Sequence, residues 1–359
     1  MRRALVVLTV LVLTLLAACS PGVPTEDPGE AERTPSATAT ADADPSPADP
    51  STSAGSTTSA EPEAPEETLP PVRSEVSLPA LMRETIGAGR IQRTRELAST
   101  ERWRSWAVTY TVNGATVSGE LLVPTGEGPF PALVLNHGYI DPAIYTLGRG
   151  MSREQEWFAD AGYVVLHTDY RGHAESDPVP DLARETRLVY TRDAIGAAKA
   201  LRKESYVDGD RLAYVGRSMG GGITYNALVA DPDLVQAAVV FAPVSSNFVD
   251  NLRQFTEPNR PSGAQAFYDR FGTPRERPAF YRGLSSRSYF DRIEVPVLIH
   301  HGDLDDVCPP QWSRDTRRAM ARAGVDVQLE TWQDGHAFGP AFADSMRRTV
   351  TFLDRRLGA

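Results

Sequence analysis

One pentapeptide, Gly216-Arg217-Ser218-Met219-Gly220, constrains the fold of this chain more than any other stretch. It follows a short apolar run that predicts a buried strand, Arg211–Val215, and it precedes a segment that predicts a helix, Gly221–Ala230. A strand, a Gly-x-Ser-x-Gly turn and a helix form the setting of a nucleophile elbow, which exposes a serine hydroxyl above a sheet. The two glycines of the motif lack a Cβ, so the strand and the helix can approach each other without a clash. The pattern therefore predicts Ser218 as a nucleophile.

The first 19 residues differ from the rest of the chain. Two arginines precede an apolar run, Ala4–Ala18, which is too short to span a bilayer comfortably and is typical of a signal peptide. The run ends in Leu16-Ala17-Ala18-Cys19, which resembles the lipobox of bacterial lipoproteins. The resemblance implies cleavage before Cys19, a lipid on that cysteine, and an exported protein anchored to the outer face of the bacterial cell membrane. An ordinary secretory signal with an incidental cysteine is the alternative.

Residues 20–77 are rich in Pro, Ala, Ser, Thr and acidic residues, and they almost lack aromatic and branched apolar side chains. Such a segment cannot bury enough surface to offset its chain entropy, so we expect a disordered acidic spacer before a catalytic domain at residues 78–359. The spacer holds 12 acidic and 2 basic residues, whereas residues 78–359 hold 35 acidic and 33 basic residues. A domain with almost no net charge lacks the excess of basic residues that is typical of nucleic-acid binding.

Strand-like and helix-like segments alternate through the body. Two strand-like runs, Trp103–Val112 and Ala115–Val123, flank the dipeptide Asn113-Gly114, which is a strong hairpin signal. The later alternation favours a mostly parallel, doubly wound sheet with helices on both faces and an antiparallel hairpin at its start. Further strands are expected at residues 132–137, 163–169, 211–215, 234–241, 295–301 and 327–332, and helices at 152–161, 186–203, 221–230, 311–323 and 341–356. In the first of these helices, we expect Ser152 as the N-cap.

Residues 245–293 interrupt this alternation with arginines, prolines and aromatic side chains. We expect a small helical cap insertion over the site, and an irregular surface excursion is the alternative. Cys308 is the only cysteine besides Cys19. If Cys19 carries a lipid, no intramolecular disulfide is available, and the domain must be held by its core.

A serine hydroxyl needs a base, and the base needs an orienting acid. The order Ser, Asp, His is the one used on doubly wound sheets of this kind. His336 lies between the last expected strand and helix, where a base could reach the serine, whereas His300 and His301 end a strand and predict a buried structural pair.

Three carboxylates, Asp303, Asp305 and Asp306, follow the preceding strand, and the local pattern does not choose among them. A surface calcium loop is a rival interpretation of this segment. It is disfavoured because the Val307-Cys308-Pro309 sequence that follows supplies no side-chain oxygen.

An acyl-transfer intermediate also needs hydrogen-bond donors for its oxyanion. The backbone N–H of Met219 is one candidate, and the N–H of Tyr139, in the loop after an earlier central strand, is the second. We expect His137 to organise that loop rather than to transfer protons. The segment Asp169–Ser176 carries Asp, His and Glu side chains, and we expect a polar turn that braces the rim of the site rather than a metal site.

Five segments of the chain carry the motifs described so far, and they follow one another in this order: Asn136–Tyr139, Asp169–Ser176, Gly216–Gly221, Pro296–Pro309 and Asp334–Phe338. Together they resemble the α/β-hydrolase domain of the prolyl oligopeptidase family, which includes dipeptidyl and acylaminoacyl peptidases and related esterases. The resemblance covers residues 78–357 and implies an α/β-hydrolase fold without a cofactor. It also implies that the aspartate three positions after the glycine, Asp305, is the acid of a triad with Ser218 and His336.

Peptidases of this family carry a large β-propeller before the hydrolase domain, whereas only about 25 residues separate the spacer from the first hairpin here. We therefore expect an extracytoplasmic serine hydrolase, carboxylesterase-like, that cleaves small ester or amide substrates. A serine-type peptidase of the same family, either an aminopeptidase or an acylaminoacyl peptidase, is the alternative. An inactive binding protein on a hydrolase scaffold is disfavoured because nucleophile, acid, base and oxyanion loop occur in one chain.

Overall fold

The computed structural model describes residues 69–358. The predicted signal peptide, Cys19 and most of the predicted spacer lie outside the described residues. The spacer was expected to reach Ser77, whereas residues 69–77 already contact the body in the structure. The Arg83 guanidinium donates to the carbonyls of Leu69 and Pro70, and the buried Ser77 caps helix α1, Leu78–Leu81.

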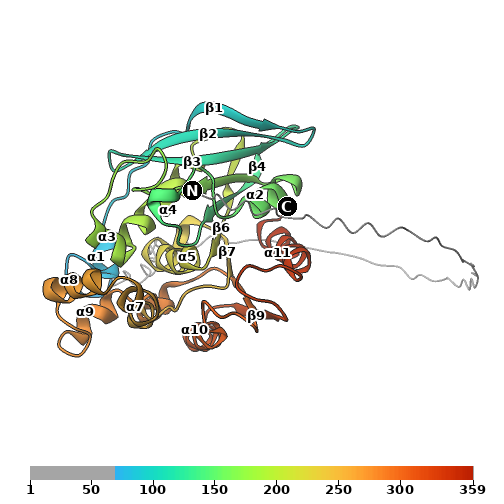
Figure 1. Ribbon diagram of the computed structural model, residues 1–359. Helices are drawn as coiled ribbons and strands as arrows, with labels where there is room; N and C mark the ends of the chain where they lie inside the picture. The colour runs from blue at the N-terminus through green and yellow to red at the C-terminus, as the bar shows by residue number, and fades with distance from the viewer. Residues whose placement is uncertain (1–68, 359) are drawn as a thin grey trace, which may run out of the picture. The chain divides into compact units, whose positions relative to one another are not determined.

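A nine-stranded sheet runs through the described residues (Figure 1). Its strands are β1 Gln92–Ser99, β2 Trp103–Val112, β3 Ala115–Pro124, β4 Phe130–Asn136, β5 Val164–Thr168, β6 Val207–Arg217, β7 Ala237–Phe241, β8 Val297–Gly302 and β9 Val327–Trp332. The spatial order is β1-β2-β3-β5-β4-β6-β7-β8-β9. The pairs β1/β2, β2/β3 and β3/β5 are antiparallel, and every later pair is parallel. The predicted α/β-hydrolase sheet with an antiparallel start is confirmed.

Helices cover both faces of this sheet, as apolar parallel strands require. Helices α2, Ser152–Asp160, and α11, Phe342–Leu357, pack on one face. Helices α4, Leu188–Leu201, α5, Met219–Ala230, and α10, Pro310–Arg322, pack on the other. The central strands β4, β5 and β7 are almost wholly buried, which explains their continuous apolar runs.

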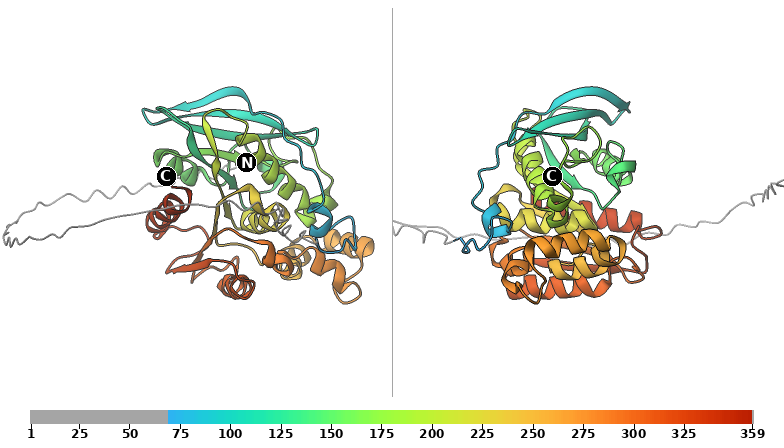
Figure 2. Two further views of the ribbon diagram at one scale, coloured as in Figure 1. Left: turned by 180° about the vertical axis from the view of Figure 1, so that it is seen from behind. Right: turned by 60° about the vertical axis from the view of Figure 1, so that its left-hand side comes forward.

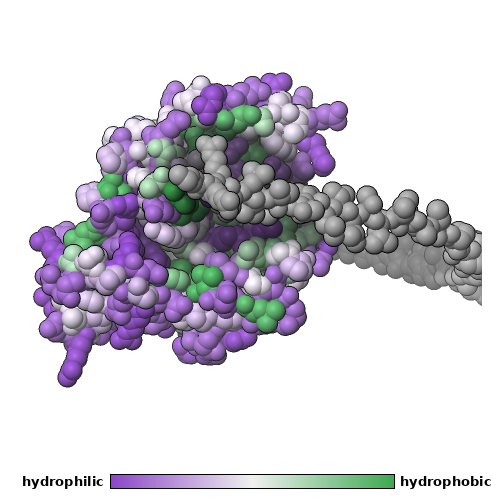
Figure 3. Space-filling view, in the orientation of Figure 1, coloured by the Kyte–Doolittle hydropathy of each residue, from purple (hydrophilic) through white to green (hydrophobic). Residues whose placement is uncertain are grey.

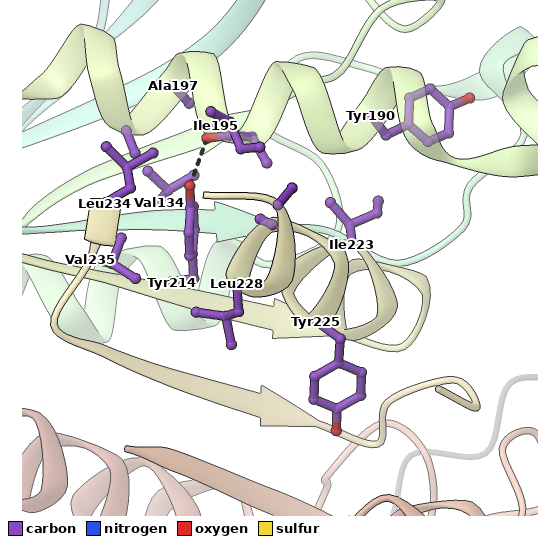
Figure 4. Packing of buried hydrophobic residues seen from close by; sticks show 14 of the residues in the cluster. Val134, Tyr190, Ile195, Ala197, Tyr214, Ile223, Tyr225, Leu228, Leu234 and Val235 are labelled. Carbon is purple, nitrogen blue, oxygen red and sulfur yellow. Dashed lines mark hydrogen bonds between the residues drawn. The ribbon is translucent and has the colours of Figure 1, made fainter. Parts of the chain in front are cut away.

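The contact between strand β6 and helix α4 fixes the part of the sheet that leads to the elbow. Figure 4 shows Tyr214 pointing from β6 toward Ile195 on α4. The Tyr214 hydroxyl donates to the Ala194 carbonyl at 3.5 Å, and all three residues are fully buried. A buried hydroxyl without a partner would be costly, so this contact lets a large polar side chain fill the core.

Several element boundaries differ from the sequence prediction. Strand β1 was not predicted, because every one of its residues is exposed and it carries no alternating apolar face. The expected helix at residues 186–203 is α4, and an additional short helix, α3 Asp181–Thr186, precedes it, with Arg187 between them at a left-handed φ of 59°. The predicted N-cap role of Ser152 is wrong, since Met151 occupies the cap position of α2.

Residues 245–293 form the expected helical insertion, here called the cap. It contains α6 Phe248–Asn251, the π-helical η3 Leu252–Thr256, α7 Glu257–Asn259, α8 Pro261–Phe271, α9 Pro278–Gly283 and the 3₁₀ segment η4 Ser286–Arg292. Both views in Figure 2 place α1, drawn in blue, beside the cap helices, drawn in orange. Buried aromatic rings of Phe248, Phe267 and Phe280 hold the cap together.

The surface over the cap is largely hydrophilic on the face drawn in Figure 3. Among residues 69–358, no helix is long and apolar enough to cross a membrane.

Candidate active site

The turn between β6 and α5 has the geometry of a nucleophile elbow. Ser218 adopts φ 54° and ψ −117°, a strained conformation for a residue with a side chain. Its N–H donates to the Phe241 carbonyl at 2.9 Å, which fixes the turn against strand β7. A Cβ on Gly220 would overlap the Asn136 carbonyl of β4, and one on Gly216 would overlap the Gly220 carbonyl. The glycine requirement inferred from the motif is therefore met by actual close approaches of backbone.

The predicted acid and base lie on neighbouring loops at the carboxyl edge of the sheet. Asp305 follows β8 and His336 follows β9. The Nδ1 atom of His336 and the Oδ2 atom of Asp305 are 2.8 Å apart, a hydrogen-bond distance. The His336 side chain is 21 % exposed, whereas that of Asp305 is 0 % exposed. The contact orients the imidazole with its other nitrogen free for a reacting group.

Asp305 is the best-supported carboxylate in its loop. Its Oδ1 accepts the backbone N–H groups of Val307 and Cys308, both at 2.9 Å. Its Oδ2 also lies 3.1 Å from Nε2 of His301. Burial alone would raise the pKa of Asp305, but the hydrogen bonds from His301, His336 and Cys308 hold it well below its usual range. Asp305 is therefore an anion throughout the neutral and mildly acidic range.

The other two carboxylates of the loop point elsewhere. Asp303 pairs with Arg314 at 3.0 Å and accepts from Gln333, and Asp306 is exposed. Of the three carboxylates, only Asp305 contacts His336.

His300 and His301 are both fully buried, and they have different surroundings. His300 lies 3.0 Å from the Thr349 hydroxyl and accepts from the Trp332 indole N–H. His301 lies 2.6 Å from the Ser313 hydroxyl and 2.9 Å from the Cys308 carbonyl. Its contact with Asp305 ties it to the candidate site, a role that sequence reasoning missed because a strand-end histidine carries no local signal for it.

Cys308 connects the acid loop to the nucleophile. Its Sγ lies 4.0 Å from the Oγ of Ser218, and its own N–H holds Asp305. Burial raises the pKa of the Cys308 thiol to about 12, and the nearby Asp305 charge adds to the effect. The thiol is therefore protonated at neutral pH and packs beside Ser218 as a small apolar group.

Arg217, the second residue of the motif, was not predicted to act at the site. Its guanidinium donates to the His336 carbonyl at 3.2 Å and forms an ion pair with the buried Glu154. It also lies over the ring of Phe338 at 5.4 Å. The residue next to the nucleophile thus holds the backbone that carries the base, although that position of the motif accepts many residue types.

The loop after β4 lies against the elbow. A Cβ on Gly138 would lie 3.2 Å from the Cβ of Ser218 and 3.8 Å from its Oγ, so the backbone that leads to Tyr139 borders the nucleophile. Met219 is the first residue of α5, where backbone N–H groups have no helical partner. Both candidate oxyanion donors therefore come from backbone beside Ser218. The Tyr139 side chain itself is 59 % exposed.

The buried side chain of His137 packs against this loop. Burial lowers its pKa to about 3, so it is neutral, and its Nδ1 lies 2.6 Å from the Gly138 carbonyl. Its ring stacks on Tyr145 with a centroid distance of 4.8 Å. His137 therefore has the contacts of a loop-organising residue.

Asp169 anchors the same region from the end of β5. It accepts hydrogen bonds from the Ser118 and Tyr145 hydroxyls, both at 2.7 Å, and from the Gly148 N–H at 3.0 Å. Burial would raise its pKa, but the adjacent His167 and these donors hold the pKa below its usual value. In the segment covered by the structure, no three His, Cys, Asp or Glu residues are arranged to hold a metal ion. The Asp169 contacts are those of a structural brace.

The fold and the elbow define an α/β-hydrolase with the parts of a serine hydrolase. The sequence comparison is more specific: residues 149–359 match the prolyl oligopeptidase family. The chain belongs to that family, and it is a serine hydrolase.

Relatives of this chain differ in how much of their length it matches. It is 25% identical over 247 residues to the uncharacterized peptidase YtmA of Bacillus subtilis, covering 67% of this chain and 88% of the relative. It is 31% identical over 154 residues to dipeptidyl peptidase 4 of Felis catus, covering 42% of this chain but only 19% of the relative. The chain thus spans about a fifth of the length of that dipeptidyl peptidase.

Solved structures share the fold. An acetyl xylan esterase from Paenibacillus sp. R4 superposes with a TM-score of 0.60 at 21% sequence identity. The superposition covers 77% of this chain and 92% of the esterase.

Proposed function

We propose that this protein hydrolyses acyl bonds as an exported, carboxylesterase-like enzyme, with Ser218 as nucleophile, His336 as base and Asp305 as orienting acid. The observation that carries the proposal is the 2.8 Å contact between Nδ1 of His336 and the buried Asp305 carboxylate. The Cys308 contacts with both Asp305 and Ser218 support the same assignment, because they hold the acid loop beside the elbow.

The proposed reaction begins with His336, whose Nδ1–H donates to Asp305 and leaves Nε2 unprotonated. Nε2 takes the proton of the Ser218 hydroxyl while Oγ attacks the acyl carbonyl carbon. The N–H groups of Met219 and Tyr139 stabilise the resulting oxyanion. His336 then protonates the leaving alcohol or amine as its bond to the acyl carbon breaks. A water molecule attacks the acyl-enzyme in the same way, which releases the acid and restores Ser218.

Two considerations favour esters over peptides. The single hydrolase domain in residues 69–358 matches nearly the full length of a protein named an acetyl xylan esterase. Among residues 69–358, the cap contacts the acid loop, since Gln254 donates to the Val307 carbonyl at 3.4 Å. Peptide hydrolysis is the second candidate, because a relative matched over 88% of its length is named a peptidase.

Paired substrates and a nucleophile variant test this proposal. We expect the protein to hydrolyse p-nitrophenyl esters faster than aminoacyl or acyl-aminoacyl p-nitroanilides. Ser218→Ala should abolish both activities and labelling by a fluorophosphonate, with an unchanged far-UV circular dichroism spectrum. Substantial turnover by Ser218→Ala would refute the assignment, and a wild-type protein that neither turns over substrate nor takes the label would be an inactive scaffold. Efficient anilide cleavage would make the peptidase the leading candidate.

We also propose that Cys19 carries a lipid that anchors the enzyme to the outer face of the cell membrane. The support is the basic start, the apolar run and the lipobox-like end described above. Growth of an expressing bacterium with an alkyne fatty acid should label the full chain, and Cys19→Ala should lose the label and leave the membrane fraction. Equal labelling of the variant would contradict the anchor.

A further inference from the structure

Arg187 is a cation that feels the charge of Glu185 but forms no direct ion pair with it. It occupies the junction of α3 and α4 with a left-handed φ of 59°, and its side chain is partly buried. Within residues 69–358, its guanidinium makes no hydrogen bond or ion pair. Burial lowers the pKa of Arg187, and the charge of Glu185 acts in the opposite direction without cancelling the effect. An arginine held in this way is ready to receive an anionic partner.

The side chain reaches the helix that starts at the nucleophile. An Nη1 atom of Arg187 lies 3.7 Å from where a Cβ on Gly222 would stand, in the first turn of α5. This is an ordinary contact distance, whereas the same Cβ would lie only 2.6 Å from the Cγ2 atom of Val244. Arg187 and Gly222 border a small cavity of about 20 Å³ with the polar side chains of Asn226, Ser245 and Ser246. That volume holds about one water-sized polar group.

Contacts connect this cation to the reacting serine. The segment after β7 that borders the same cavity donates from the Val244 N–H to the Ser218 carbonyl at 3.1 Å. The positive charge of Arg187 also acts on the Cys308 thiol, where it opposes the rise in pKa caused by burial. The sulfur of Cys308 lies 4.0 Å from the Ser218 Oγ. Arg187 therefore lies in the electrostatic surroundings of the nucleophile.

Glu185, the acid that raises the pKa of Arg187, is paired directly with a different arginine. Both carboxylate oxygens of Glu185 pair with Arg260 of the cap, one of them at 3.1 Å, and Thr256 donates to the same carboxylate at 3.2 Å. The Arg260 guanidinium also lies 5.9 Å from the centre of the Tyr139 ring. The cap, the oxyanion loop and Glu185 therefore come together beside Arg187. None of them forms a direct ion pair with its guanidinium.

We propose that Arg187 binds a carboxylate on the acyl part of the substrate, so that the enzyme favours monoesters or amides of short dicarboxylic acids, including peptide bonds that follow an acidic residue. This inference rests on the proposed function and names its substrate class. The acyl side is assigned because the leaving group must meet His336 on the β9–α11 loop, whereas Arg187 lies against α5 and the segment after β7. The polar side chains beside Arg187 suit a carboxylate oxygen better than an apolar chain.

Matched substrate pairs test the inference. The acyl pair is the p-nitrophenyl monoester of adipic acid against its methyl-capped, neutral counterpart, with glutamyl and glutaminyl p-nitroanilides as the amide version. The leaving-group pair is 4-acetoxybenzoate against its methyl ester. Rates are corrected with Ser218→Ala, and enzyme concentration is set by fluorophosphonate titration. We expect kcat/KM for the anionic acyl substrate to exceed that for its neutral partner by about tenfold or more, as a charged hydrogen bond allows.

Variants of Arg187 test whether this residue causes the preference for the anionic acyl substrate. Arg187→Met should bring this ratio to about one, and Arg187→Lys, which keeps the charge but loses the planar fork, should give an intermediate ratio. Arg275→Met removes the same charge from an exposed cap position and should leave the ratio at its wild-type value.

Three results would overturn the inference: no preference in the wild type, a preference that survives in Arg187→Met, or a preference found only in the leaving-group pair. If turnover depends on Ser218 but the anionic and neutral acyl substrates have equal kcat/KM, the proposed function stands and the proposed carboxylate site at Arg187 is wrong. If no substrate of either pair is turned over, the proposed function fails and the inference fails with it.

Discussion

Replacing Asp305 by Asn is the most informative perturbation of the proposed triad, because the structure fixes how the new amide must sit. The Oδ1 position of Asp305 faces two backbone N–H donors, from Val307 and Cys308. The amide oxygen must therefore take that position, and the NH₂ group must take the position that faces His336 and His301. The substitution thus exchanges an acceptor for a donor at the imidazole.

The expected cost follows from this geometry. A donor facing Nδ1 of His336 forces the imidazole proton onto Nε2, where the base must be unprotonated to receive the serine proton. A wrong histidine tautomer costs a serine triad about 10⁴-fold in kcat, which is about 5.5 kcal/mol in the activation barrier. The amide also faces His301, whose Nε2 lies 2.9 Å from the Cys308 carbonyl and therefore carries a proton. That opposition of two donors should lower the free energy of unfolding by about 1–3 kcal/mol.

The assay is kcat for a p-nitrophenyl ester, with urea unfolding as the measure of stability. Asp306→Asn is the matched control, since it makes the same change at an exposed position one residue along and should keep most of the wild-type kcat. If Asp305→Asn kept more than about a tenth of the activity, the tautomer argument would be wrong. If Asp306→Asn lost as much as Asp305→Asn, the acid would have been assigned to the wrong residue.

Two further substitutions test the elbow and the buried histidines. Gly220→Ala places a methyl group on the carbonyl of strand β4 and should cost about 3 kcal/mol or more in urea unfolding. Gly263→Ala, whose nearest contact would be an ordinary 3.7 Å, should change stability by less than about 1 kcal/mol, and equal losses would refute the elbow argument. Burial lowers the pKa of His300 from 6.5 to about 3, so the unfolded chain binds the proton first and stability falls as pH drops below 6.5. His300 contributes a slope that approaches about 1.4 kcal/mol of unfolding free energy per pH unit. The free energy of unfolding of His300→Gln should therefore depend less steeply on pH between about pH 7 and pH 4.5. If the curves for the variant and the wild type were parallel, His300 would not contribute to the pH dependence.

Much of the architecture could be predicted because its signals are local. The hairpin over Trp103–Val112 and Ala115–Pro124 follows from the dipeptide Asn113-Gly114, and the structure pairs Val112 with Ala115 across that turn. The buried parallel strands follow from apolar runs that need cover on both faces. Strand β1 carries no such run, because it lies at the sheet edge and only its backbone pairs with β2.

The candidate site also has features that the sequence predicts and features that it does not. The Gly-x-Ser-x-Gly turn needs only local steric reasoning, and the order of serine, aspartate and histidine follows from the chain. The contacts of Arg217 with the His336 carbonyl and of His301 with Asp305 join segments that no spacing rule connects. Which residues become neighbours across loops depends on how strands are ordered in the sheet, and the sequence does not state this directly.

The sequence by itself determined the sharp turn at Ser218, the alternation that builds a doubly wound sheet, and the family, because glycine sterics and apolar periodicity act over a few residues. Only the tertiary structure decided which of three carboxylates meets His336, since Asp305 alone receives two backbone donors while Asp303 pairs with Arg314. It also decided that Arg187 forms no direct ion pair near the nucleophile, because Glu185 pairs directly with Arg260 of the cap. Both outcomes depend on competition among charges brought together by folding, and such competition cannot be read from neighbours along the chain.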